Sequence, residues 1–269
     1  MGTLKLRVFS INDFETVLKG LSRIVSSAAL EVSTKGTKIA ANSDSKIRAF
    51  ISTEALQLIS ENDSDSVQLC FESIQKLLKM IMFVKDIGEE VETAEFETDE
   101  ANLYYKGKGS IKLKLDKYEK VQPFVSSPIK TELTPLFQFE LPDDRIKKIL
   151  NYSQFNENYE VKLYFYIKDK TLMCDIDDKQ ESVGRLTRVS IPITNRFRGV
   201  IDSPFVIDIN DLRKINIFDR PGIKVCLCAK SVNGQIDDRV KCIKVASDFE
   251  NEKEGVRTNM FAVVRLLKA

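Results

Sequence analysis

The hydrophobic and polar positions follow the same plan four times along the chain. Each time, a strand-like apolar pattern leads through a short polar residue to apolar positions spaced i, i+3 and i+4. That spacing places the apolar residues on one face of a helix. The segments read RVFSINDFETVLKGL from Arg7, QLCFESIQKLLKMI from Gln68, QFELPDDRIKKIL from Gln138 and FVIDINDLRKINIF from Phe205. The pattern predicts four strand–helix units.

Each predicted helix has an apolar stripe and a residue suited to cap its first turn. The stripes are Phe14, Val17, Leu18 and Leu21; Ile74, Leu77, Leu78 and Ile81; Ile146, Ile149 and Leu150; and Leu212 with Ile215. Side-chain oxygens bond the free N–H groups of a first turn, so the expected N-caps are Asn12 or Asp13, Ser73, Asp143 and Asn210. The first stripe residues recur every 60–72 residues, so the chain is an internal repeat of four similar units.

Strand patterns fill the space between the helices. Alternation and β-branched or aromatic residues predict strands at 29–33, 38–41, 46–53, 93–97, 103–106, 110–115, 159–167, 172–176, 186–191, 224–229, 238–245 and 259–267. The polar stretch 245–259 resembles an inserted loop. Residues 117–135 contain three prolines and no helical period, which is typical of a linker. The sequence therefore predicts an α+β fold with two similar domains, 1–116 and 136–269, joined by a connector at 117–135. Each domain contains two β-α-β-β-β units.

The composition is that of an ordinary globular protein. Of the 269 residues, 43% are hydrophobic and 30% are charged, and no apolar run approaches the roughly 20 residues of a membrane span. The N-terminus begins directly in a strand pattern, so we expect no signal peptide and an intracellular protein. The five cysteines lie in strand patterns, and we expect them to be buried free thiols.

Catalytic and metal-binding patterns are scarce. The chain has no histidine, which excludes Ser-His and Cys-His nucleophile systems and the usual zinc sites. It also lacks a Walker sequence and a G-x-S-x-G elbow. The D-x-D pattern at Asp175 and Asp177 is one arrangement that holds a divalent metal, but its position after an apolar run favours the end of a strand. We therefore expect no enzymatic activity, no catalytic residues, no metal and no cofactor.

The helix faces opposite the apolar stripes are basic. The net charge is only +1, yet four equivalent faces carry cations, while an acidic patch lies at 89–100. Clustered Lys and Arg without interleaved aromatic residues favour contact with phosphates over readout of bases. For any single helix, a solvated surface is the simpler interpretation. The candidate phosphate-facing residues are Lys19, Arg23, Lys76, Lys79, Arg145, Lys147, Lys148, Arg213 and Lys214.

The repeated strand–helix–hairpin plan with a linker after the second unit resembles the sliding clamps of DNA replication. The two-domain type includes the proliferating-cell nuclear antigen (PCNA) and the T4-like phage clamp. The resemblance covers the whole chain and is clearest in SSAALEVSTKGTKIAANSDSKIRAFI, SPFVIDINDLRKINIF and TNMFAVVRLLKA. It implies a DNA-clamp fold with helices on the inner face and sheets outside. It also implies a homotrimeric ring around double-stranded DNA, bound without sequence specificity.

The resemblance further implies partners and a second site. The partners are a DNA polymerase, for which the clamp is a processivity factor and accessory protein in cellular, phage or viral replication, and a clamp loader. The location is the cytoplasm of a prokaryotic or phage-infected cell, or the nucleus of a eukaryote. A hydrophobic groove for partner peptides would use Ile47, Pro123, Phe124, Val125, Ile129, Met260, Phe261, Val263 and Val264. Alternation along strands predicts that about half of this set is strand core, and the connector residues are the better candidates.

Four alternatives stay open at this stage. The same fold serves a monomeric processivity subunit or one member of a heteromeric checkpoint-type clamp. A β-rich virion or scaffold protein would use the repeat without binding DNA. An enzyme using carboxylates such as Asp175 and Asp177 is the remaining alternative.

Overall fold

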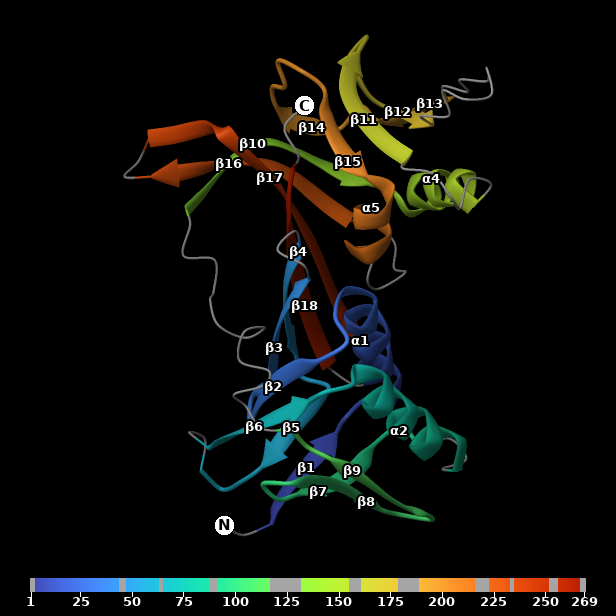
Figure 1. Cartoon of the computed structure of the whole chain (residues 1–269), viewed down its shortest axis with the longest axis vertical. Helices are drawn as coiled ribbons and strands as arrows, with labels where there is room; N and C mark the ends of the chain where they lie inside the picture. The colour runs from blue at the N-terminus through green and yellow to red at the C-terminus, as the bar shows by residue number, and fades with distance from the viewer. Residues whose placement is uncertain are drawn as a thin grey trace. The chain divides into compact units, whose positions relative to one another are not determined.

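The chain forms two compact units. The first contains Met1–Pro128 and Asp248–Phe261, and the second contains Ile129–Ser247 and Ala262–Ala269. The structure is a computed structural model (Figure 1). It describes residues 3–43, 47–62, 65–87, 91–116, 132–154, 161–178, 189–215, 223–232, 235–251 and 256–266. The connector predicted at 117–135 lies mostly outside these ranges, but its last residues, 132–135, already belong to a strand that begins at Glu132.

The first unit contains two of the predicted repeats. Its elements are β1 (Leu4–Val8), α1 (Ile11–Ile24), β2 (Ala28–Ser33), β3 (Gly36–Ser43), β4 (Ile47–Thr53), β5 (Leu56–Ile59), β6 (Ser66–Phe71), α2 (Ile74–Ile87), β7 (Ala94–Thr98), β8 (Asn102–Lys106) and β9 (Ser110–Lys114). The order β1-α1-β2-β3-β4 and the order β6-α2-β7-β8-β9 are the same β-α-β-β-β plan. Strand β5 is an addition that the sequence pattern did not predict.

The second unit repeats this plan twice more. Its elements are β10 (Glu132–Leu141), α4 (Asp143–Gln154), β11 (Val161–Lys168), β12 (Thr171–Asp178), β13 (Val189–Thr194), β14 (Phe197–Gly199), β15 (Phe205–Asp208), α5 (Ile209–Ile215), β16 (Ile223–Val232), β17 (Gln235–Asn251) and β18 (Val256–Arg265). Strands β17 and β18 each contribute residues to both units. The predicted α+β fold with four β-α-β-β-β units is confirmed.

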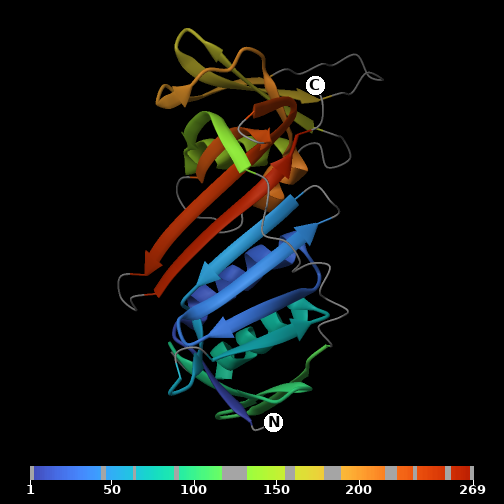
Figure 2. The same cartoon turned by 90° about the vertical axis from the view of Figure 1, so that its left-hand side faces the viewer.

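Two sheets and two helices enclose the core of the first unit. One sheet has the strand order β5-β1-β7-β8-β9, and the strands of the other follow the order β18-β4-β3-β2-β6. Figure 2 shows α1 and α2 behind β2, β3 and β6. A buried hydroxyl pair at 2.7 Å, between the Oγ1 atoms of Thr53 and Thr258, helps to hold β4 beside β18.

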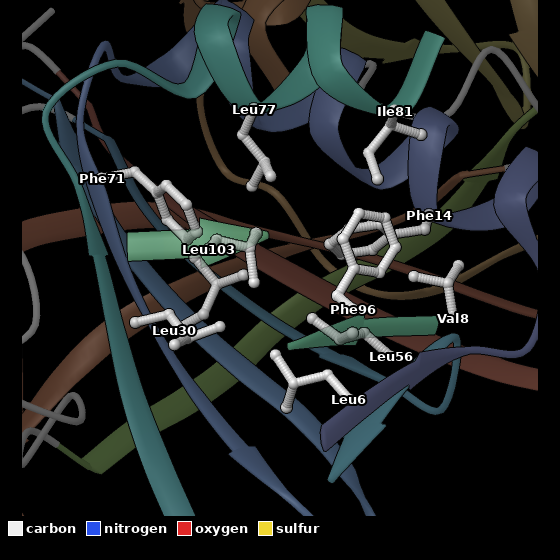
Figure 3. A pocket seen from close by; sticks show the side chains of 11 residues that line it. Leu6, Val8, Phe14, Leu30, Leu56, Phe71, Leu77, Ile81, Phe96 and Leu103 are labelled. Atoms are coloured by element: carbon white, nitrogen blue, oxygen red, sulfur yellow. The ribbon is translucent and has the colours of Figure 1, made fainter. Parts of the chain in front are cut away.

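Apolar side chains from both helices and both sheets meet at the centre of this unit (Figure 3). Phe14 of α1 and Leu77 of α2 lie opposite Leu6, Leu30 and Phe96 of the sheets. They leave a void of about 10 Å³, the room of a single water molecule, with no polar lining atom to hold one. The void is therefore a packing gap and not a ligand site.

The second unit has its own core, which is rich in phenylalanine. Its strands follow the orders β13-β12-β11-β15 and β14-β10-β16-β17. The rings of Phe165 and Phe205 stack at 5.0 Å with an interplanar angle of 7°. On β10, the ring centroid of Phe139 lies 5.9 Å from that of Phe165 and 6.4 Å from that of Phe205. The ring centroid of Phe137 lies 5.2 Å from that of Phe197. Ile146 and Ile149 of α4 are also fully buried, as expected for a helix that turns its apolar stripe inward.

The caps of two helices lie earlier than the sequence predicted. Helix α1 is capped by Ser10, whose Oγ accepts a hydrogen bond of 3.2 Å from the backbone N of Asp13, not by Asn12 or Asp13. Asp208, not Asn210, accepts from the first turn of α5 at 2.8 Å. Ser73 caps α2 as predicted. In α4 the carbonyl of Pro142 accepts from Arg145 and Ile146, so Asp143 lies inside the first turn.

The polar stretch 245–259 is mostly strand and not a loop. Strand β17 continues to Asn251, and β18 begins at Val256. The loop predicted from the polar composition is therefore wrong, because a strand held by backbone hydrogen bonds does not need apolar side chains on an exposed face. Among the described helices, none is long and apolar enough to cross a membrane.

Candidate functional site

A buried carboxylate joins the two helices of the first unit. The Oε1 of Glu15 on α1 lies 2.6 Å from the Nζ of Lys19, one turn along the same helix, and its Oε2 lies 2.9 Å from the Nζ of Lys85 on α2. The side chain of Glu15 is only 9% exposed, whereas those of Lys19 and Lys85 are 52% and 45% exposed. The start of α1 is thereby tied to the last turn of α2.

Opposing effects act on the pKa of Glu15. Burial raises it, because the charged form loses water, but the hydrogen bonds and charges of Lys19 and Lys85 outweigh burial. The pKa therefore lies below its ordinary value, and Glu15 is an anion at neutral pH. One consequence is that Lys19, predicted to face DNA, is already partly neutralised by Glu15.

The exposed faces of α1 and α2 display cations. Lys19, Arg23, Lys76 and Lys79 are all exposed, opposite the buried stripes of the two helices. Both acids of α1, Asp13 and Glu15, are buried, so they add no acidic group to the exposed face. Because α1 and α2 pack against each other, the structure brings the four predicted cations into one helical layer. We call this the basic helix face.

The second unit shows a less one-sided pattern. On α4, Lys147 pairs with Asp143 at 2.6 Å and Arg145 lies 3.4 Å from Asp144, while Lys148 is exposed. On the short α5, Arg213 and Lys214 are half-buried, and Arg213 donates to the Oδ1 of Asn210 at 3.3 Å. The acids that favour the first turn of these helices also offset part of their positive charge.

The predicted groove residues divide into three groups. Ile47 and Val264 are each 1% exposed, so their side chains lie in the packed interior and not on an open groove. In β4, residues at every second position from Ile47 to Thr53 point inward, which explains the burial of Ile47. Val263 is half-buried. Met260 and Phe261 lie on β18 with side chains outside the described part, and Pro123, Phe124, Val125 and Ile129 lie outside the described residues.

An apolar patch borders an open sheet edge of the first unit. Strand β9 ends its sheet, and Ile111 and Leu113 on β9 are only half-buried. Phe83 on α2 is 43% exposed. A Cβ added at Gly109 would lie 3.5 Å from the Phe83 ring and 3.2 Å from Ile87, so the end of α2 packs beside the turn into β9. We call Phe83, Ile111 and Leu113 the edge patch.

The second unit also ends in an open strand. Strand β13 ends the sheet β13-β12-β11-β15 and contains Pro192, which has no N–H to donate and suits an edge position. Val189 and Ile191 on this strand are half-buried. Among the described strands, β9 and β13 are therefore each paired on one side only, as are β5, β6, β14 and β15.

Hydroxyl groups bond the first carboxylate of the D-x-D pattern, Asp175. Asp175 is buried on β12, where its Oδ1 accepts from the Oγ of Ser190 at 2.6 Å and from the hydroxyl of Tyr166 at 3.0 Å. Asp177 belongs to the same strand. Within the described ranges, no group of three or more His, Cys, Asp and Glu residues is placed to hold a metal ion.

Solved structures with this fold span the whole chain. It is similar to A. fulgidus PCNA, solved with the C-terminal region of FEN-1 bound (11% identity, 99% of each chain, TM-score 0.67). It is also similar to PCNA from Entamoeba histolytica (11% identity, 99% of this chain and 100% of that one, TM-score 0.65). A third is the PCNA2–PCNA3 complex from Sulfolobus tokodaii (12% identity, 97% and 98%, TM-score 0.58). No protein-family model and no curated protein matches the sequence. The chain therefore has the PCNA-like two-domain fold of DNA sliding clamps.

The ion pairs of Glu15 give the first testable prediction. Glu15→Gln should lower the free energy of unfolding by more than the roughly 0–1 kcal/mol of an exposed pair. The decrease should be smaller than the roughly 3–5 kcal/mol of a fully buried one, because both lysines reach solvent. The lowered pKa means that this stabilisation is complete above the ordinary pKa of a glutamate and is lost as pH falls through the lowered pKa. Urea unfolding from pH 7 to pH 3 measures it, and an equal decrease at both ends would contradict the ion-pair account.

Proposed function

We propose that this chain is a subunit of a sliding clamp that encircles duplex DNA and holds a DNA polymerase on its template. The full-length likeness of its fold to PCNA chains is the observation that supports this most strongly. A clamp acts as a processivity factor by remaining linked to the DNA, so it needs no catalytic group, cofactor or metal. The protein would act wherever the DNA is replicated, in the cytoplasm of a prokaryotic or phage-infected cell or in a nucleus.

The basic helix face would lie toward the DNA. Lysine and arginine side chains attract the phosphate backbone without reading bases, and such contacts exchange readily with solvent ions. A ring held by topology needs only this non-specific attraction, because the closed path prevents escape while the contacts permit sliding. Lys76 and Lys79 would contribute more than Lys19 in the first unit, since Glu15 shares the charge of Lys19.

Ring closure would use two of these end strands, β9 and β13. We propose that β9 of one copy pairs with β13 of the next, so that the unsatisfied backbone groups of both strands are bonded across the contact. The edge patch would be covered at the same contact. Because the two edges differ, the contact is heterologous, and such contacts form closed rings when the rotation between subunits permits it. Three copies would give a homotrimer.

A heteromeric ring is the second candidate. One of the similar structures is a complex of two different PCNA chains, and heterologous edges suit unlike neighbours as well as identical ones. A chain that is monomeric alone but forms rings with a second clamp subunit would favour this candidate over the homotrimer.

Partner proteins would bind through the connector. We propose that Pro123, Phe124, Val125 and Ile129 provide apolar contacts for short peptides from the polymerase, the clamp loader and other DNA enzymes. Apolar side chains in a proline-rich linker seldom have a core to join, so a partner is the usual reason for them.

The first prediction of this proposal concerns the basic helix face. Changing Lys76 and Lys79 together to Ala should weaken retention on duplex DNA and flatten its salt dependence, by about 0.9 in the log–log slope for each phosphate that is no longer neutralised. Titration over a series of salt concentrations measures both. The control variant, Lys35→Ala with Lys38→Ala, removes the same charge from the β2–β3 hairpin. It should change neither the retention on DNA nor its salt dependence. Equal effects of the two pairs would make Lys76 and Lys79 ordinary surface lysines.

The edge patch gives a second prediction. Phe83→Glu should dissociate the ring, because it places a charge beside β9 where the next copy would cover it. Met82→Glu is the matched control: Met82 is similarly exposed, at 41%, but as the neighbour of Phe83 in the helix it points about 100° away around the axis. Native mass spectrometry should show 30.6-kDa monomers for the first variant and the wild-type mass for the second. Wild-type assembly in both would exclude the edge patch from the contact.

The connector gives a third prediction. Phe124→Ala should weaken binding of a fluorescent peptide from the C-terminus of the cognate polymerase by about tenfold or more, as removal of an apolar anchor does. Ser126→Ala, in the same connector, should leave binding unchanged. Fluorescence anisotropy measures the affinity, and unchanged binding by the Phe124 variant would move the peptide site elsewhere.

A further inference from the structure

Three thiols form a line across two strands of the second unit. Cys226 and Cys228 are two residues apart on β16, so both lie on the same face, with sulfur atoms 3.3 Å apart. Cys242 on β17 lies directly opposite Cys228 in the antiparallel register. Cys228 and Cys242 are buried, and Cys226 is partly exposed. The clamp proposal uses none of these side chains.

The backbone spacing favours one pair for a disulfide. Residues directly opposite on antiparallel strands have Cα atoms about 4.5–5.5 Å apart, inside the range of about 4.4–6.8 Å that disulfides span. Residues two apart on one strand are about 6.4–6.8 Å apart, at the upper limit of that range. Cys228 and Cys242 are therefore the better placed pair, even though the sulfur atoms of Cys226 and Cys228 are in contact.

The surroundings of this pair permit a small backbone adjustment. The register of β16 against β17 shifts between Ala229 and Lys230, one residue beyond Cys228. A register shift of this kind interrupts the ladder and lets a strand bend locally. Lys244 lies opposite Cys226 on β17, which places a positive charge near the thiols.

The pKa values of the thiols indicate which one ionises first. The hydrogen bond from Cys228 outweighs burial and lowers the pKa of Cys242. For Cys228, the hydrogen bond with Cys226 lowers the pKa, but the bond to Cys242 and burial outweigh it and raise the pKa to about 11. The bond to Cys228, followed by burial, raises the pKa of Cys226. Cys242 is therefore the first of the three thiols to ionise.

We propose that Cys228 and Cys242 are an oxidation site, at which a hydroperoxide links β16 to β17 through a disulfide. The Cys242 thiolate attacks one oxygen of hydrogen peroxide, the O–O bond breaks, and a sulfenic acid and hydroxide form. Cys228 then loses its proton as its sulfur attacks the sulfur of Cys242. The S–O bond breaks, and its oxygen leaves as water. In sum, two thiols and one hydrogen peroxide give one disulfide and two waters, the peroxide accepting both electrons.

Tryptic mapping of the full-length protein tests this site directly. After treatment of the native protein with hydrogen peroxide and alkylation of the remaining thiols, cleavage after Lys224, Lys230, Lys241 and Lys244 separates VCLCAK from CIK. The expected product is the two peptides joined and lighter by two hydrogens. The five free thiols should fall to three.

Two cysteine variants and a denatured control show which thiols form the disulfide and whether the fold directs it. Cys226→Ser should retain the joined peptides, and Cys228→Ser should abolish them, while Cys70 and Cys174 should remain alkylated throughout. Oxidation in denaturant should replace the single link by mixed pairings, which would show that the folded register directs the wild-type product. An internal disulfide within VCLCAK, a link that persists in Cys228→Ser, or no link in the native wild-type protein would each overturn the proposal.

Discussion

Burial of one apolar face of each helix against its sheet is the constraint on which the rest of the structure depends. Phe14 and Leu77 are almost fully buried in the first unit, as are Ile146 and Leu212 in the second, and each belongs to a stripe that meets the sheets. Seating a helix in this way leaves its opposite face outside the core. The exposed cations of α1 and α2 follow from that geometry, and in α1 the acids Asp13 and Glu15 are drawn inward to bonds with Ser10 and with lysine.

The repeated architecture was predictable because helical and strand periods are local properties of the sequence. The four helices, most strands and the β-α-β-β-β order follow from side-chain spacing alone. The caps of α1 and α5 did not, since several polar residues compete there and only backbone geometry selects Ser10 and Asp208. The polar part of β17 was also missed. Its strand conformation is held by backbone hydrogen bonds, which do not depend on side-chain polarity, so the sequence there shows no apolar alternation.

The candidate sites were predictable only in part. Sequence spacing placed Lys19, Arg23, Lys76 and Lys79 on exposed faces, but the joining of Lys85 to Glu15 depends on how two helices separated by the strands β2–β6 pack. The Glu15–Lys19 spacing of four residues was the available signal for half of that contact. Ile47 and Val264 were assigned to a groove by position in the family, whereas alternation along their strands buries them. The third thiol, Cys242, needed the register of β16 against β17.

The proposed encirclement of DNA predicts that the assembled protein leaves a circular DNA only when the circle is cut. The protein would be placed on nicked circular DNA with its cognate loader and ATP, washed at high salt, and then followed while a restriction enzyme cuts the circle. A ring held by topology should remain on the circle at high salt and leave through the new ends after cutting. Dissociation from the intact circle at high salt, or retention after the cut, would contradict encirclement.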